Sequence, residues 1–512
     1  MLNSLPEPPH HQTQDSFFDT EHLRNDLKGR SMRGGAITIA SQIVKLFTQS
    51  GGTLLLARLL TPEDFGLIGM VTALLTLAEI FKEFGISSAI IQTPKINHIQ
   101  ASTLFWINVG ISALISIAIA SLSPIISVFY DEPRLTLIVL ALSGLFIISG
   151  LAVQHQAILR RQMQFRRLAL LEIISMVGGI TTAIVLAING LGYWSMIISR
   201  FVQAITFTLG TWISCKWRPG LPSRSANVSS MLKFGANFTG FKFANYFSRN
   251  LDNILIGKYV GSQALGLYAM AYRLLLLPVQ QINAPVASVA IPTLSILQQE
   301  PKKHARYYYR AILIITFIGM PIVSFLFVEI DNIVLILLGD QWSKTVTIFR
   351  LLVPAAFVGT FNVATGWIYM SLGRVDRQFR QEIIVSVITI FSFIVGIRWG
   401  ALGVAAVYGL TNPLLMFGSL VYCFRGTNIR IVTFAKTILL PAFCSLISAV
   451  MLVTARYFYL GKNNDLISLF FGILLYLIFY FINWFSIPGG REKLKQIFES
   501  IKALKSPKNL QT

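Results

Sequence analysis

The chain has 512 residues, of which 54% are hydrophobic and only 13% are charged, and its mean hydropathy is +0.64. Soluble domains carry about 25% charged residues, and a soluble chain this apolar would expose large hydrophobic patches. The composition excludes an ordinary soluble protein. It predicts an all-α integral membrane protein, because a helix satisfies its own backbone hydrogen bonds in lipid.

The net charge of +21 has two interpretations. A basic chain either binds nucleic acid or gathers its cations in cytoplasmic loops, and the order of the charges along the chain must decide. The three cysteines, Cys215, Cys423 and Cys444, are widely spaced and have no CxxC pair or histidine cluster nearby. Neither a disulfide framework nor a metal site is predicted, and we expect no cofactor.

Residues 1–30 are polar and predict a cytoplasmic tail, because they lack the apolar core of a cleavable signal peptide. Crossing a hydrocarbon layer of about 30 Å takes about 20 apolar residues in a helix. Fourteen segments meet this requirement: 33–57, 66–84, 102–124, 135–154, 168–188, 192–213, 230–257, 263–292, 308–328, 346–371, 381–397, 401–424, 431–455 and 466–486. The eighth contains Pro278, Pro285 and Pro292, and we expect it to bend.

The loop charges support this topology. With the N-terminus inside, the cytoplasmic segments hold most of the 43 Lys and Arg residues. The outer segments hold only Arg58, Arg134, Lys258, Lys344, Arg398, Arg456 and Lys462. This is the positive-inside pattern, so the net charge needs no nucleic-acid partner and both termini are predicted to be cytoplasmic. The loops are too short for a folded aqueous domain, and we expect His98, His155 and His304 to be solvent-facing loop residues.

An internal repeat divides the chain. Residues 55–77 align without a gap with residues 255–277, and seven pairs are identical at an offset of 200: Leu55, Gly66, Leu67, Met70, Leu74, Leu75 and Leu77 with their later partners. An even number of predicted helices separates the copies, so the repeat is parallel, as in transporters with two lobes. The predicted organisation is a tail at 1–30, a six-helix lobe at 31–213, a linker at 214–229, a second six-helix lobe at 230–424, two further helices at 425–486 and a basic cytoplasmic tail at 487–512.

Two polar stripes are related by the same offset. Steps of three and four keep residues on one helix face, and charges at mid-bilayer depth face protein or water. The stripes, with Arg273 of the eighth segment, predict a polar cavity. Their residues are Gln42, Lys45 and Gln49 in the first segment and Lys242, Asn245, Arg249 and Asp252 in the seventh.

Purely structural roles stay open for these charges. Lys45 can pair with Glu79, and Arg249 can pair with Asp252 one turn away. Arg200 and Arg350 lie nearer the ends of their segments, where long side chains reach the interface. Lys436 and Glu172 are predicted to be interfacial anchors for the same reason.

Two segments resemble a known family. They are RGGAITIASQIVKLFTQSGGTLLLARLLTPEDFGLIGMV and DNILIGKYVGSQALGLYAMAYRLLLLPVQQINAPVASVAIPTLS. Both are similar to Wzx-type polysaccharide exporters of the multidrug/oligosaccharidyl-lipid/polysaccharide (MOP) flippase superfamily. The resemblance covers residues 30–486 and implies two lobes around a central cavity. It also implies transport of an undecaprenyl-diphosphate-linked oligosaccharide from the cytoplasmic to the periplasmic leaflet of a bacterial inner membrane.

The resemblance implies the cargo, and the charges of this sequence alone supply the candidate residues that would bind it. We expect the cargo diphosphate to contact Arg249 and Arg273, supported by Lys45 and Lys242, because arginine binds phosphate in a bidentate fork. Gln42, Gln49 and Asn245 would complete the polar lining, and Glu79 or Asp252 would bind a coupling ion. Expected partners are the lipid bilayer, the lipid-linked oligosaccharide, and a polysaccharide polymerase and glycosyltransferases.

Two other classes of protein fit the sequence less well. A multidrug or metabolite antiporter of the same superfamily should have an acidic cavity for cations, whereas the stripe residues carry more cations than carboxylates. A membrane polymerase or glycosyltransferase should show paired carboxylates in its outer loops, and ATP hydrolysis should show a phosphate-binding loop; neither pattern is present. The sequence therefore predicts a transporter and not an enzyme.

Overall fold

The computed structural model describes residue 18 and residues 27–83, 96–223, 250–460 and 466–505. In these segments every regular element is a helix, which confirms the predicted all-α class. Contacts divide the chain into two compact units, Met1–Gln263 and Ala264–Thr512. The predicted domain boundaries stay predictions, and the division falls within the first turn of the second helix of the later repeat copy, between Gln263 and Ala264.

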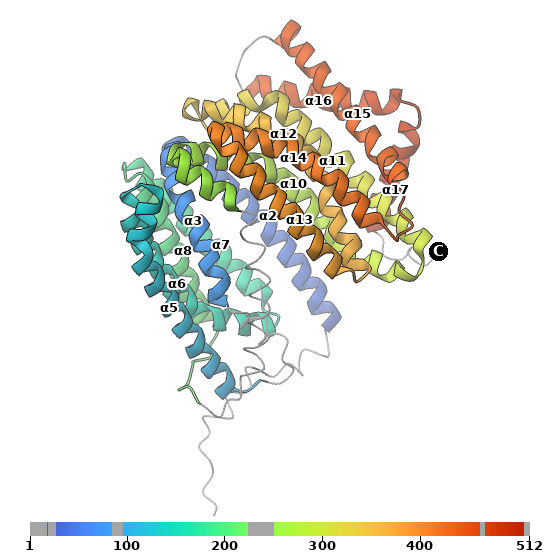
Figure 1. Cartoon of the computed structure of the whole chain (residues 1–512). Coiled ribbons are helices and arrows are strands. Elements are labelled where there is room, and N and C mark those ends of the chain that lie inside the picture. Colours follow the sequence, from blue (N-terminus) through green and yellow to red (C-terminus); the bar gives the residue numbers. More distant parts are fainter. Residues whose placement is uncertain (1–17, 19–26, 84–95, 224–249, 461–465, 506–512) are drawn as a thin grey trace, which may run out of the picture. The chain divides into compact units, whose positions relative to one another are not determined.

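The described part of unit 1 contains six long helices, followed by a helical stretch at residues 250–260; Figure 1 shows the labelled helices. The six are α2 (Leu27–Leu59), α3 (Pro62–Glu83), α5 (His98–Tyr130), α6 (Arg134–Arg161), α7 (Phe165–Ile188) and α8 (Tyr193–Ser214). Helix α10 (Ser262–Ile296) begins at the end of unit 1. Unit 2 continues with α11 (Pro301–Leu337), α12 (Ser343–Ser371), α13 (Val375–Gly396), α14 (Gly400–Phe424), α15 (Ile431–Ala455), α16 (Leu466–Ser486) and α17 (Gly490–Lys505).

Within the described residues, nine helical segments are long and apolar enough to cross a membrane. A tenth candidate is a bent pair, Ser262–Asn283 and Pro285–Gln299, with an angle of 42° between its parts. The bend lies where the sequence places Pro285, as expected for a proline inside a helix. The chain is therefore a multi-pass membrane protein, while the count of fourteen spans and the pair of six-helix lobes stay predictions.

The two repeat copies have the same local structure in their described parts. Helix α2 ends at Leu59 and α3 begins at Pro62, and residues 250–260 are followed by α10 at Ser262. The two turns are built differently. Thr61 and Asp64 cap α3 reciprocally, with backbone–side-chain distances of 2.9 and 3.2 Å, whereas Gly261 makes its turn with a φ of 98°.

The start of the predicted linker packs against α5. Trp217 is fully buried, and its Nε1 donates a hydrogen bond to His98 Nδ1 at 3.0 Å. The backbone of Gly220 bonds Ser102 and Trp106 of α5 at 2.9 Å each. Residues 215–223 are therefore an integral part of unit 1.

The histidine expectation was wrong at two positions. His155 lies inside α6, is fully buried and stacks on Trp212 with ring centroids 4.4 Å apart. His304 is buried in α11, with Nε2 at 3.1 Å from Ser371 Oγ. The helices extend beyond the apolar segments counted from the sequence, so residues placed in loops become part of helix packing.

The basic tail is also more ordered than a loop. Residues 490–505 form α17, and its Leu494 and Ile497 are buried in a cluster with Leu313 of α11 and Trp484 of α16. Their spacing of three places both on one helix face. The tail therefore continues the apolar core of unit 2.

Candidate functional site

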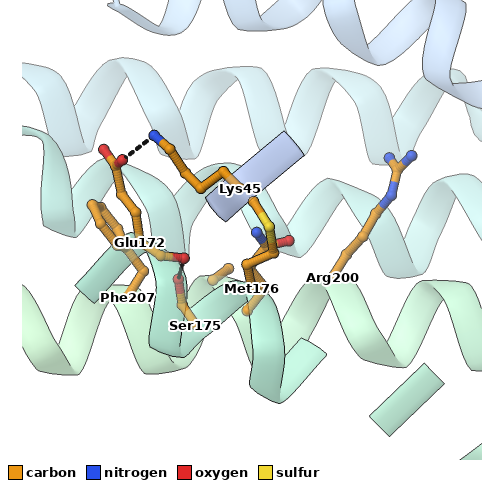
Figure 2. A pocket seen from close by; sticks show the side chains of 8 residues that line it. Lys45, Glu172, Ser175, Met176, Arg200 and Phe207 are labelled. Atoms are coloured by element: carbon orange, nitrogen blue, oxygen red, sulfur yellow. Dashed lines mark hydrogen bonds and ion pairs between the residues drawn. The ribbon is translucent and has the colours of Figure 1, made fainter. Parts of the chain in front are cut away.

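A charged pocket lies among three helices of unit 1. Its volume is about 410 Å³, and Figure 2 shows its lining. Helix α2 contributes Lys45, α7 contributes Glu172, Ser175 and Met176, and α8 contributes Arg200, Gln203, Ala204 and Phe207.

Small residues bring these three helices close together. A Cβ atom on Gly52 of α2 would lie 2.8 Å from the side chain of Ile180 of α7. A Cβ on Gly179 of α7 would lie 3.0 Å from the backbone oxygen of Ser199 of α8. These glycines let the backbones approach, as small residues do between membrane helices, and so place the pocket side chains within reach of one another.

Lys45 is paired across the pocket. Its Nζ lies 2.5 Å from Glu172 Oε2, and the two side chains are 17% and 28% exposed. From the sequence, Glu79 is a possible partner of Lys45 and Glu172 is expected to be an interfacial anchor. In the structure, Glu172 forms the ion pair with Lys45 and lines the pocket (Figure 2). The half-buried pair leaves this part of the pocket without net charge.

Arg200 is bonded differently in the part of the chain that the structure describes. Its Nη2 donates a hydrogen bond to Thr72 Oγ1 of α3 at 3.1 Å. Glu79 of α3 attracts it from beyond ion-pair distance. Within the described residues no carboxylate lies at ion-pair distance from Arg200. Its guanidinium points away from the Lys45–Glu172 pair in Figure 2, so the pocket keeps one cation that is bonded only to Thr72 among the described residues.

The other predicted site residues are distributed differently. Gln42 and Gln49 are exposed on α2 and do not line this pocket. Asp252 is buried in unit 1 and accepts a hydrogen bond from the backbone of Asn253 at 2.8 Å. Arg273 is half-buried on α10 in unit 2. Lys242, Asn245 and Arg249 lie outside the described residues.

Sequence reasoning found Lys45 but gave Glu172 and Arg200 lesser roles. Both residues are charges inside predicted spans, a feature that indicates a polar site. Their closeness to the ends of these spans favoured interfacial roles instead. Arg350 is also placed near the end of its segment by the sequence, and its side chain is exposed and forms an ion pair with Asp331. The described residues contain no cluster of metal-ligating side chains, and the three cysteines are free and buried.

The fold and the pocket define a multi-pass helical membrane protein with a cationic pocket inside its helix bundle. The chain belongs to the polysaccharide biosynthesis protein family, whose pattern matches residues 55–347. It is 26% identical to the lipopolysaccharide biosynthesis protein WzxC of Escherichia coli (strain K12) over 76% of this chain and 80% of that protein. It is also 26% identical to the teichuronic acid biosynthesis protein TuaB of Bacillus subtilis (strain 168), over 90% and 95%.

A solved structure has a similar fold. The lipid II flippase MurJ, in an inward closed conformation, superposes with a TM-score of 0.69 at 18% identity, over 88% of this chain and 99% of that one. The comparison concerns the fold, because the identity is low.

Proposed function

We propose that this protein is a flippase that moves a lipid-linked oligosaccharide, a precursor of a surface polysaccharide, from the cytoplasmic to the periplasmic leaflet of a bacterial inner membrane. Family membership supports a place in polysaccharide biosynthesis. The shared fold with a lipid II flippase supports a lipid-linked cargo. Both termini would lie in the cytoplasm, as the loop charges predict.

The observation that carries this proposal is the state of Arg200. A charge inside a membrane span is costly unless it faces protein or water, and Arg200 lies in a pocket without a carboxylate at ion-pair distance within the described residues. A diphosphate would stabilise it, because guanidinium groups bind phosphate oxygens through charge-assisted, bidentate hydrogen bonds.

The Lys45–Glu172 pair gives the pocket a second state. Without cargo, Glu172 neutralises Lys45 at 2.5 Å. When a diphosphate enters, Lys45 can turn from the carboxylate to the phosphate, so that binding exchanges one ionic contact for another. Such an exchange keeps the affinity of the pocket for the diphosphate moderate. Moderate affinity is needed because the cargo must be released on the far side of the membrane. An antiporter for cationic drugs would need excess negative charge here, and the lining has two cations and one carboxylate.

Arg200 is tested by glycan export in cells that lack the natural protein. Removing charge-assisted hydrogen bonds of about 1.5–3 kcal/mol should lower export by about tenfold to a hundredfold in Arg200→Ala, whereas Arg200→Lys should keep part of it. The control is Arg350→Ala, which removes an exposed arginine that pairs with Asp331 outside this pocket. Wild-type export by Arg200→Ala at matched protein levels would reject the assignment.

The sequence-based candidates belong to the same proposal. Arg249, Arg273 and Lys242 are proposed to contact the diphosphate at another stage of transport, and the same export assay tests their alanine variants. No ATP-binding pattern is present, so an ion gradient or the cargo gradient would supply the energy, while glycosyltransferases build the cargo beforehand and a polymerase uses it afterwards.

Ion coupling is a separate proposal with its own test. Glu79, exposed on α3, and the buried Asp252 are the candidate ion ligands. If either binds the coupling ion, the combined Glu79→Gln and Asp252→Asn variant should lose the dependence of transport on pH or sodium in reconstituted vesicles. An unchanged dependence would exclude both residues from coupling.

A further inference from the structure

A second pocket of unit 1 is built like a binding groove for an amphiphile. It has a volume of about 380 Å³ and lies between the first turns of α7 and the end of α8. Its lining consists of two cations, one serine and four aliphatic side chains: Arg167, Lys216, Ser214, Leu170, Leu171, Ile174 and Ile213. No acidic side chain lines it.

The two kinds of side chain are separated along the groove. Arg167 is on the first turn of α7, and Lys216 follows the last residue of α8, so the cations share one end. Leu170 and Ile174 follow Arg167 at helical spacing on the same side of α7. At 1.5 Å of rise per residue, the apolar wall extends roughly 10 Å from the charged end.

The donors at the charged end are available. Arg167 Nη1 donates to Gln164 Oε1 at 2.8 Å and, in a longer bond, to the Ser214 carbonyl at 3.5 Å, which leaves its Nε and Nη2 groups for another acceptor. Lys216 is exposed and makes no hydrogen bond or ion pair with the part of the chain that the structure describes. An anionic group lying between them would therefore gain two charge-assisted contacts.

The described part of the chain leaves the apolar wall exposed. Leu170, Ile174 and Ile213 are 50%, 56% and 76% exposed, and they lie on helices apolar enough to cross a membrane. In a bilayer their neighbours are acyl chains. The charged end lies on the side that the positive-inside pattern predicts to be cytoplasmic, where anionic lipids attract basic residues.

We propose that this groove binds one anionic phospholipid of the surrounding bilayer. Its phosphate would lie between Arg167 and Lys216, and one acyl chain would follow Leu170, Ile174 and Ile213. A zwitterionic headgroup fits less well, because its positive group would be repelled by Arg167 and Lys216. The groove residues include no acidic side chain that could bind this positive group. This groove shares no lining residue with the pocket at Glu172, so the proposed lipid site does not depend on the proposed cargo pocket.

The test is native mass spectrometry of the full-length protein in detergent, titrated with phosphatidylglycerol or phosphatidylcholine. The wild-type chain should retain one phosphatidylglycerol at least about tenfold more tightly than phosphatidylcholine, the effect expected of one or two charge-assisted bonds. Arg167→Gln combined with Lys216→Gln should abolish this preference. Equal binding of both lipids by the wild-type chain would overturn the proposal.

Three further measurements make the test specific. The matched control is Arg166→Gln, which removes a neighbouring exposed arginine that does not line the groove and should leave the preference intact. Lys216→Gln alone should weaken the preference without disturbing a protein contact, so the proposal stays testable if the double variant fails to fold. Displacement of phosphatidylglycerol by an equal concentration of undecaprenyl phosphate would instead assign the groove to the cargo carrier and reject the phospholipid site.

Discussion

A Glu329→Gln chain is expected to be less stable than the wild type by about 3–5 kcal/mol, the cost of breaking a buried ion pair from one side. The Glu329 side chain is fully buried and the Arg456 side chain is 13% exposed. Arg456 holds both carboxylate oxygens, with Nε–Oε1 and Nη2–Oε2 distances of 2.8 and 2.6 Å. Asn332 donates a further bond to the carboxylate at 2.7 Å.

This pair connects three elements of unit 2. Glu329 is on α11, Arg456 begins the short π-helical segment Arg456–Leu460 that follows α15, and Arg456 also donates to the backbone oxygen of Ser468 on α16 at 3.1 Å. Gly472 of α16 leaves room for the pair, since a Cβ there would lie 3.0 Å from a Glu329 oxygen. Neutralising Glu329 leaves Arg456 as a buried charge without compensation, and should loosen α16 from α11.

Thermal unfolding in detergent measures this effect, with Asp331→Asn as the matched control. Asp331 is on the same helix, but its pair with Arg350 is exposed, with side chains 56% and 45% accessible, and surface pairs contribute about 0–1 kcal/mol. Replacing both Glu329 and Arg456 by methionine should restore most of the lost stability, because no unpaired charge remains. Equal melting temperatures for Glu329→Gln and Asp331→Asn would contradict the explanation.

Gly66→Ala should have the second large effect, a loss of correctly folded protein. A Cβ atom on Gly66 would lie 1.7 Å from the carbonyl oxygen and 2.4 Å from the carbonyl carbon of Ser262. Both are backbone atoms, so no side-chain rotation relieves the clash. The first turns of α3 and α10, which are equivalent positions of the repeat, would have to move apart.

The yield of monodisperse protein in size-exclusion chromatography and its melting temperature test this prediction. Gly51→Ala is the control, because Gly51 also lies in a helix but a Cβ there would meet nothing within 4 Å. Alanine at an open helical position should be neutral or stabilising by about 0.5–1 kcal/mol. If Gly66→Ala behaves like Gly51→Ala, the two turns do not pack as closely as the structure places them.

Local properties of the sequence were enough to predict the class and much of the helical structure. Apolar length identifies segments that cross a bilayer, and Pro285 marks the bend in the α10 segment, because both effects act within one helix. The repeat at an offset of 200 also predicted that the helix–turn–helix at Leu59 and Pro62 would recur at residues 260 and 262. Helix ends were less predictable, since residues such as His155 continue a helix beyond its apolar part.

Only the tertiary structure decided which charges meet. The sequence indicates the depth and face of a charged residue on its own helix, but a partner on another helix depends on how the helices pack. Lys45 pairs with Glu172 and Glu329 pairs with Arg456, each across 127 positions of the chain. These contacts require the close approach allowed by Gly52, Gly179 and Gly472. The sequence by itself therefore determined a multi-pass helical membrane protein with charges inside its spans. Helix packing decided that Arg456 is neutralised by Glu329, whereas Arg200 lies in a pocket with no carboxylate of the described residues at ion-pair distance.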